Sequence, residues 1–323
     1  MCTAISYLTQ NHYFGRNLDL EKHFQESVTI TPRNFPFRFR SMPAQVRHYA
    51  IIGMASVVEN YPLYYDATNE KGLSIAGLNF PGFATYFPAK QGMDNVASFE
   101  LIPYLLGQCA TVEEVRKLLE RLNLTEEAFA PGLPPSPLHW LIADRERSIV
   151  LEPMTDGLKN YENPVGVLTN NPPFDYHLLH LADFMHLHPG PVENKFAPDI
   201  PITPYSRGMS TIGLPGDLGS ASRFVKAAYT KLHSVCDGTE IGSVSQFFHL
   251  LGSVEQQRGA VIHNGEYEIT YYSSCCNTDK GIYYYTTYDN RQITAVDLYR
   301  EDLERNDLIS YPLLLSQQIH LQN

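Results

Sequence analysis

Cys2 follows the initiator Met1 directly, and this placement gives one residue two parts of a catalyst for acyl transfer. Methionine aminopeptidases remove Met1 when the next residue is small, which leaves Cys2 with a thiol and a free α-amine. The thiol is a nucleophile, and an α-amine with a reference pKa of about 7.7–8.0 can accept and return a proton near neutral pH. These two residues indicate covalent catalysis at the chain terminus, although many chains begin with Met-Cys by chance.

The residues after Cys2 predict a β-hairpin, with strands at 2–9 and 12–17 around a polar turn. A paired return strand would bring Arg16 and Asp19 back beside Cys2. A guanidinium near a thiol favours the thiolate, and a nearby carboxylate can hold or orient the terminal amine. The alternative is an exposed Arg–Asp pair at a strand end, which would contribute little.

Five sequence blocks, in order and far apart, resemble the choloylglycine hydrolase family, which contains bile salt hydrolases and penicillin V acylases. The blocks are Met1-Cys2-Thr3, Phe14 to Asp19, Asn69 to Phe80, Gly166 to Pro172, and Gly213 to Phe224. The resemblance covers the whole chain and is greatest to bile salt hydrolases of lactobacilli and enterococci. It implies an α+β fold, the αββα four-layer sandwich of N-terminal-nucleophile hydrolases, in a single domain over 1–323 with Met1 removed.

The same resemblance implies a role for six residues. Cys2 would be the nucleophile and its α-amine the base. Arg16 and Asp19 would set the protonation state of Cys2. Asn170 and the backbone N–H of Asn79 would stabilise the oxyanion, and Arg223 would be the remaining charged residue of the site. A shift by one residue to Asn171 stays open, because two Asn residues are adjacent. Amide hydrolysis through a thioester needs two such N–H donors. It gives no task to a metal ion or an organic cofactor, so none is expected.

Composition limits the partners of the chain. The 323 residues carry a net charge of −11, which argues against a nucleic-acid partner. There is no basic run for a membrane surface, no apolar run of 18 residues and no signal peptide, so we expect a bacterial cytoplasmic protein. Its five cysteines lack metal-site spacing, and we expect Cys275 and Cys276 to be reduced. The family resemblance implies a homotetramer.

Hydrophobic patterns predict strands, then helices, then strands again. Further strands are expected at 26–33, 35–41, 48–57, 62–79, 138–143, 147–153, 164–169, 267–275, 281–288 and 292–298. Helices are expected at 101–106, 112–122, 174–185, 220–234 and 244–254. We interpret the four histidines at 177–188 as a solvated helix face rather than a zinc site.

A proline-rich loop at 128–137 suggests a wall of a binding site, with a packed surface loop as the equal alternative. We expect Leu18, Phe129 and Leu133 to contact the sterol of a bile acid, because they are apolar and the resemblance implies such a substrate.

Three functions remain open at the level of sequence. The first is hydrolysis of bile acids conjugated to glycine or taurine. The second is acylase activity on penicillin V or a related amide, against which Asn79 argues, since penicillin V acylases of this family commonly carry Tyr at that position. The third is a non-catalytic binding protein, which the presence of Cys2, Arg16, Asp19, Asn170 and Arg223 disfavours.

Overall fold

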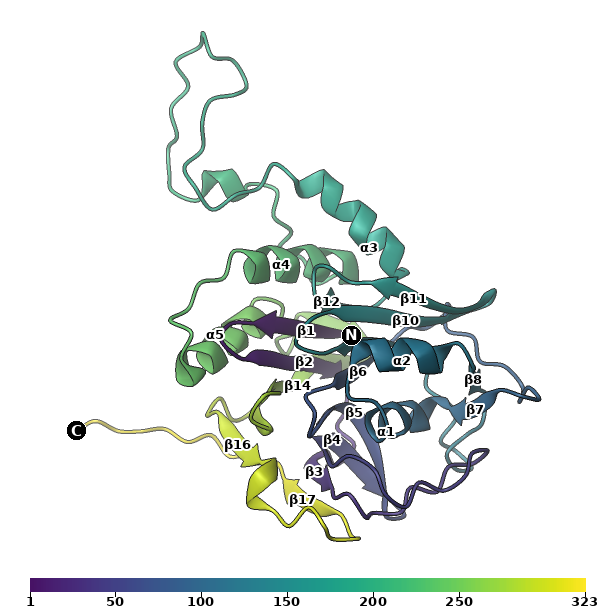
Figure 1. The fold of residues 1–323 in the computed structure, drawn as a ribbon. Coiled ribbons are helices and arrows are strands. Elements are labelled where there is room, and N and C mark those ends of the chain that lie inside the picture. Colours follow the sequence, from purple (N-terminus) through teal and green to yellow (C-terminus); the bar gives the residue numbers. More distant parts are fainter.

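Two β-sheets lie face to face between two layers of helices in the computed structural model, which describes residues 1–323 (Figure 1). Strands β1, β2 and β6 meet across the space between the sheets. Helices α4 and α5 cover the outer face of the first sheet, and α1 covers the outer face of the second. This confirms the expected α+β fold with four layers in the order αββα.

The first sheet carries the N-terminal hairpin at its centre. Its strand order is β12-β1-β2-β14-β15-β16, and β13 pairs with β14. The strands are β1 (Cys2–Leu8), β2 (His12–Leu20), β12 (Val167–Leu168), β13 (Val261–His263), β14 (Glu266–Asn277), β15 (Ile282–Thr287) and β16 (Thr294–Asp297). All of these pairs are antiparallel, so the chain terminus is anchored between two partner strands.

The second sheet has the strand order β11-β10-β9-β6-β5-β4-β3-β17. Its strands are β3 (Ser27–Thr31), β4 (Ile51–Val58), β5 (Tyr61–Asn69), β6 (Ser74–Asn79), β9 (Leu138–Ala143), β10 (Ser148–Met154), β11 (Gly157–Glu162) and β17 (Ile309–Pro312). A separate parallel pair joins β7 (Asp94–Ala97) to β8 (Leu122–Thr125).

The α-helices are α1 (Leu101–Leu106), α2 (Val112–Leu119), α3 (Phe174–His180), α4 (Ser220–Leu232) and α5 (Glu240–Gly252). Thr111 caps α2, because its hydroxyl accepts a hydrogen bond from the Glu114 N–H at 3.2 Å. Four short 3-10 segments accompany them at Ser98–Glu100, Leu181–Phe184, Met209–Thr211 and Leu298–Arg300. None of the helices combines the length and apolar character needed to cross a lipid bilayer.

Two hydrophobic clusters stabilise the layers. A cluster of 36 buried residues includes Cys2, Leu18 and Phe224, and joins the two sheets and the helices beneath the hairpin. A cluster of 26 buried residues includes Trp140 and Leu105, and lies between the second sheet and its helices. Alternate residues of one strand enter different clusters, as the two-residue period of a strand requires.

Several predicted elements were wrong in extent. The expected strand 35–41 is an aromatic loop in which the Phe37 ring packs on Phe35 and His48. The expected strand 62–79 is two strands, since Gly72 turns the chain with φ +89°. Strands β7, β8, β11, β13 and β17 were not predicted, because they are short or lie at sheet edges.

Candidate active site

The register of the N-terminal hairpin places Arg16 beside the Cys2 side chain. Cys2 lies opposite Leu18, and Ala4 lies opposite Arg16. Directly opposed residues of an antiparallel pair share a face, so the side chains of Cys2, Leu18 and Arg16 all point into the space between the sheets. Arg16 crosses this space, and its Nη1 donates to the carbonyl oxygens of Gly77 and of Tyr65, the latter at 3.0 Å.

Arg16 is completely buried and surrounded by potential anions. Burial acts to lower its pKa, but the negative charge available on Cys2, followed by that of Tyr272 and Asp66, outweighs burial and raises the pKa. Its Nη2 has no hydrogen-bond partner in the protein. A permanent positive charge with a free N–H thus lies next to the thiol, which favours the thiolate.

Asp66 of β5 is a buried carboxylate that sequence analysis did not select. It accepts hydrogen bonds from the hydroxyl groups of Tyr272 at 2.6 Å, Tyr283 at 2.7 Å and Ser274 at 3.1 Å. Burial raises its pKa, and the charge of Arg16 acts in the opposite direction. Asp66 therefore supplies a counter-charge for Arg16 from the second sheet.

Asp19 lies on the other face of the hairpin, toward the helices. Its Oδ1 accepts a hydrogen bond from the Thr270 hydroxyl at 2.6 Å, whereas its Oδ2 is buried without a partner. Burial raises its pKa, and the terminal ammonium and Arg223 act against this rise. The Met1 ammonium donates to the Asp19 carbonyl oxygen at 2.8 Å and to Glu268. The Asp19 carboxylate thus lies close enough to the chain terminus to feel its charge, and its role toward the Cys2 amine stays a prediction.

Arg223 holds the first residues of β1 from helix α4. Its Nη1 donates to the Cys2 carbonyl oxygen and to the Thr3 hydroxyl, the latter at 2.7 Å. Its Nη2 donates to Asn170 Oδ1 at 2.8 Å. Burial lowers the pKa of this guanidinium, while Asp19 and Cys2 counteract the fall.

Asn170 connects the chain terminus to the second sheet. Its Oδ1 accepts from the Cys2 backbone N–H at 2.7 Å, and its Nδ2 donates to the Asn79 carbonyl oxygen at 2.7 Å. Asn170 Nδ2 carries two hydrogens, of which the Asn79 carbonyl oxygen accepts one; the predicted oxyanion role requires the other. The Ser220 hydroxyl accepts from the Asn170 backbone N–H at 2.8 Å, which fixes the residue.

Asn79 contributes its backbone, because its side chain is exposed. In a strand, the N–H and C=O groups of residues i and i+2 point to the same edge. Gly77 directs its carbonyl oxygen to Arg16, so the Asn79 N–H lies on this same edge, facing the site. The structure therefore brings together Cys2, Arg16, Asp19, Asn79, Asn170 and Arg223, the six residues to which the family resemblance gives a role, and those roles stay a prediction.

The interpretation of His177 as part of a solvated helix face was wrong. His177 is fully buried, and its Nε2 donates to the Asn170 carbonyl oxygen at 2.9 Å. Burial lowers its pKa to about 4, so it is neutral at physiological pH. The available signal was a histidine seven residues after Asn170, on the short helix that begins at Phe174. Asn171 instead donates to the Pro81 carbonyl oxygen at 2.6 Å, closer to the surface.

The three predicted sterol contacts have different surroundings. Leu18 is buried opposite Cys2, and Leu133 is 43% exposed on the proline-rich loop. Phe129 is buried, with its ring packed against Phe99 at 5.2 Å and Tyr61 at 5.8 Å. Phe129 thus supports its loop from beneath, and the prediction of a sterol wall depends mainly on Leu133.

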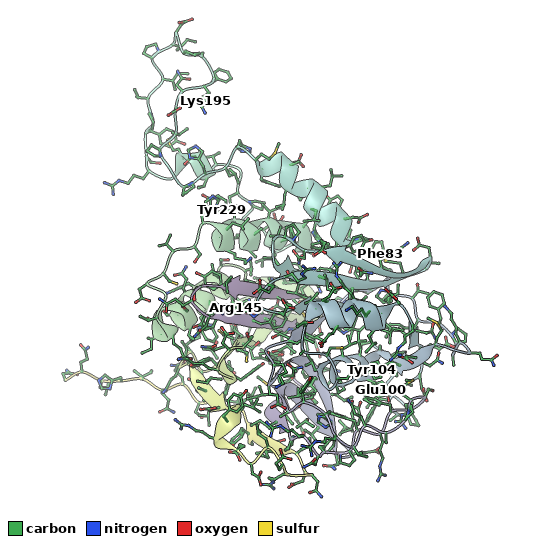
Figure 2. The ribbon with its side chains drawn as sticks, in the orientation of Figure 1. Phe83, Glu100, Tyr104, Arg145, Lys195 and Tyr229 are labelled. Atoms are coloured by element: carbon green, nitrogen blue, oxygen red, sulfur yellow. The ribbon has the colours of Figure 1, made fainter.

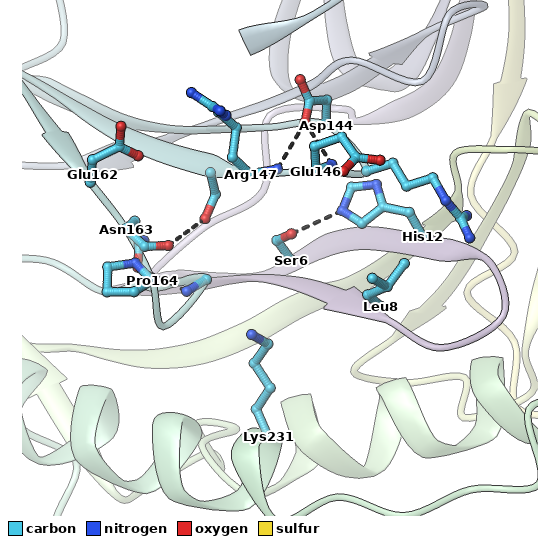
Figure 3. A pocket seen from close by; sticks show the side chains of 13 residues that line it. Ser6, Leu8, His12, Asp144, Glu146, Arg147, Glu162, Asn163, Pro164 and Lys231 are labelled. Atoms are coloured by element: carbon cyan, nitrogen blue, oxygen red, sulfur yellow. Dashed lines mark hydrogen bonds between the residues drawn. The ribbon is translucent and has the colours of Figure 1, made fainter. Parts of the chain in front are cut away.

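A polar cavity of about 280 Å³ lies at the opposite end of β1 (Figure 3). Ser6, His12 and Lys231 line it, and Ser6 shares a hydrogen bond of 2.9 Å with His12. Cys2 and Leu8 are separated by about 20 Å at the usual rise per residue of a strand, so this cavity is not part of the site around Cys2. No group of three or more His, Cys, Asp or Glu residues is arranged to hold a metal ion, and all five cysteines are free.

Comparison with known proteins identifies relatives over the full length. A bile salt hydrolase/transferase from Lactiplantibacillus plantarum is 56% identical over 100% of both chains. A bile salt hydrolase/transferase from Clostridium perfringens is 35% identical over 96% of both chains. The crystal structure of a mutant conjugated bile acid hydrolase from Clostridium perfringens superposes with a TM-score of 0.93, at 34% identity and 100% coverage of both chains.

A penicillin V acylase from Agrobacterium tumefaciens shares the fold, with a TM-score of 0.76 at 17% identity over 96% of this chain and 90% of the acylase. Residues 2–311 match the model of the linear amide C–N hydrolases, choloylglycine hydrolase family. The site around Cys2, the full-length relatives and this match agree, and the chain belongs to the choloylglycine hydrolase family of linear amide C–N hydrolases.

Proposed function

We propose that this protein is a bile salt hydrolase, which cleaves the amide bond between a bile acid and glycine or taurine. The observation that carries the proposal is the bridge by Asn170 from the Cys2 nitrogen to the Asn79 carbonyl oxygen. This bridge supports a site in which Cys2 is nucleophile and base, and in which the Asn79 N–H and Asn170 Nδ2 are the two oxyanion donors. The substrate class is supported by the names of relatives that match over the full length.

The residues of this chain account for each step of such a reaction. After Met1 is removed, the Cys2 sulfur attacks the amide carbonyl, and the Asn79 N–H and Asn170 Nδ2 stabilise the oxyanion. The α-ammonium protonates the leaving amine, which departs as a thioester forms. Water, activated by the same amine, then releases the bile acid. Arg223 and Asp19 hold the terminus in place throughout.

Penicillin V acylase activity is the alternative with the same chemistry. Asn79 disfavours it, since the family's penicillin V acylases commonly carry Tyr at this position. A non-catalytic binding protein of this fold is less favoured, because the proposed machinery is complete.

An assay panel tests the proposal. Purified protein is incubated with glycocholate, taurocholate and penicillin V, and released amine or acid is measured. Mass spectrometry of the active protein shows whether Met1 is absent. We expect hydrolysis of the conjugated bile acids, and we expect Cys2→Ala to abolish it while the fold is retained. Activity in a folded Cys2→Ala variant, or hydrolysis of penicillin V alone, would contradict the proposal.

We also propose a homotetramer built from single-domain subunits. The segment between α3 and α4 projects far from the sheets, with Lys195 near its end (Figure 2). It exposes Phe196 by 91%, Tyr205 by 84% and Met185 by 82%, and such a patch is expected to be covered by another subunit. Light scattering coupled to size exclusion measures the mass, and Phe196→Ser with Tyr205→Ser should lower it. The cytoplasmic location stays a prediction.

A further inference from the structure

A fully buried glutamate and histidine form a pair behind the two proposed oxyanion donors. Glu152 of β10 and His139 of β9 are both 0% exposed, and Glu152 Oε1 lies 3.0 Å from His139 Nδ1. Glu152 also accepts from the Phe174 N–H at 3.1 Å, at the start of α3. Neither residue contacts Cys2 in any hydrogen bond, so the mechanism above gives them no task.

The hydrogen bonds of His139 fix its orientation. Its Nε2 lies 2.8 Å from the Thr169 carbonyl oxygen, which can only accept, so this nitrogen carries a hydrogen. One further proton is shared between Nδ1 and Glu152. The pair is neutral as a whole whichever partner holds that proton, which makes complete burial tolerable.

The imidazole of His139 contacts a neighbour in sequence of each proposed oxyanion donor, Asn79 and Asn170. Thr169, which accepts from it, directly precedes Asn170. The Phe80 ring, which directly follows Asn79, stacks on it with centroids 4.3 Å apart and planes 6° apart. Phe83, labelled in Figure 2, continues the stack on Phe80 at 5.2 Å. A displacement of His139 would therefore move the two donors relative to each other.

We propose that Glu152 and His139 are positioning residues, which set the separation of the Asn79 N–H and Asn170 Nδ2 without contacting the substrate. This inference rests on the proposed function, because it needs an oxyanion to form at that place. Displacement of a catalytic group by about 1 Å can cost roughly 10²-fold in rate. The pair is thus expected to act on kcat rather than on KM.

Matched substitutions at Glu152 separate geometry from charge. In Glu152→Gln, an amide group at the Oε1 position donates to His139 Nδ1, and an oxygen at the Oε2 position, 3.3 Å from the Phe174 nitrogen, accepts from its N–H. Both contacts are then retained without a carboxylate. In Glu152→Ala, both contacts are lost. We expect near wild-type kcat for Glu152→Gln and a fall of roughly 10- to 100-fold for Glu152→Ala, with KM changed less than about twofold.

Alkylation of Cys2 by iodoacetamide distinguishes this role from general damage to the site. Attack on a saturated carbon forms no oxyanion, so its rate reports the nucleophile without the two donors. We expect an unchanged alkylation rate in Glu152→Ala while hydrolysis falls. Trp140→Phe is the matched control. Trp140 is fully buried and follows His139 in the chain, but it packs on the opposite face of the second sheet. This substitution should leave kcat unaltered.

The outcomes are distinguishable. Equal loss of alkylation and hydrolysis, a rise in KM, or a Glu152→Gln variant as slow as Glu152→Ala would overturn the positioning role. If Glu152→Ala does not fold, His139→Phe tests the proposal instead. The Phe ring can retain the stack on Phe80 but cannot donate a hydrogen bond to Thr169. An unaltered kcat in His139→Phe would overturn the positioning role. A wild-type protein that hydrolyses no conjugated bile acid would overturn the proposed function, and this inference with it.

Discussion

The side-chain amide of Asn170 donates to the backbone carbonyl of Asn79 at 2.7 Å, and this bond joins the segment after β12 to the end of β6, each of which supplies a proposed oxyanion donor. The same carboxamide accepts from the Cys2 N–H at 2.7 Å. One side chain therefore sets the distance from the nucleophile to both donors. This hydrogen bond holds the backbone of Asn79, so the Asn79 N–H can act in the site although the Asn79 side chain is exposed.

The first prediction concerns Asn170. Asn170→Ala removes a donor to the oxyanion and the brace on Asn79, so kcat for conjugated bile acids should fall about 10²- to 10³-fold with little change in KM. Steady-state kinetics measures both. Asn171→Ala is the control, because that residue bonds only to the Pro81 carbonyl nearer the surface. A larger loss of kcat in Asn171→Ala than in Asn170→Ala would show that Asn171, and not Asn170, is the oxyanion donor.

Local sequence predicted the part of the site that a single hairpin determines. Arg16 and Leu18 follow Cys2 within one turn and two strands, so their return to its side depends only on hairpin pairing. Asn79, Asn170 and Arg223 come from distant elements, and only the family resemblance could assign them. No local pattern reports which strands will face each other, so distant residues cannot be placed from periodicity alone.

The buried polar residues around the site escaped sequence analysis for the same reason. Asp66, His139 and Glu152 are isolated polar residues in strands made mostly of apolar and aromatic residues, and such a pattern does not show what a single polar side chain contacts. The second sheet is covered on both faces, so these positions point into the space between the sheets instead of to solvent. Their partners lie on other elements, 206 residues away for Asp66 and Tyr272 and 30 residues away for His139 and Thr169.

The second prediction concerns the proline-rich loop. Leu133 is 43% exposed, so a bound sterol can cover it, and Leu133→Ala would lose about 1 kcal/mol of binding, or roughly a fivefold rise in KM. Because the contact exists before and during reaction, kcat should change less. Leu232→Ala, an exposed leucine at the end of α4, serves as the control. An unchanged KM for every conjugated bile acid would exclude this loop as the sterol wall.

The third prediction concerns the stability contributed by Asp66. Asp66→Ala leaves the hydroxyl groups of Tyr272 and Tyr283 without their acceptor and removes one of the negative charges that act on Arg16. We expect the free energy of unfolding to fall by about 3–5 kcal/mol, as when one partner of a buried charged group is removed. Urea denaturation followed by circular dichroism measures the change. Glu193→Ala on the projecting segment is the exposed control, and equal effects of the two substitutions would contradict a structural role for Asp66.

The fourth prediction concerns the pH dependence of stability at His12. His12 is buried between Ser6 and Thr278, and burial lowers its pKa to about 4. In the unfolded chain its pKa is about 6.5, so between pH 6.5 and 4 the unfolded state binds a proton that the folded state does not. Stability from this residue is therefore lost as the pH falls through that window, by about 1.4 kcal/mol per pH unit.

His12→Gln removes this titration and retains hydrogen-bonding groups. Buried acids such as Glu100, whose pKa burial raises to about 6, titrate with the opposite sign but are common to both proteins, so they cancel in the difference. Urea denaturation of the wild-type protein and His12→Gln at pH 6.5, 5.5 and 4.5 measures it. We expect the free energy of unfolding of the wild type to fall relative to the variant at each step. Parallel curves would mean that His12 takes up a proton equally well in the folded and unfolded states, which two hydroxyl neighbours in a buried site make unfavourable.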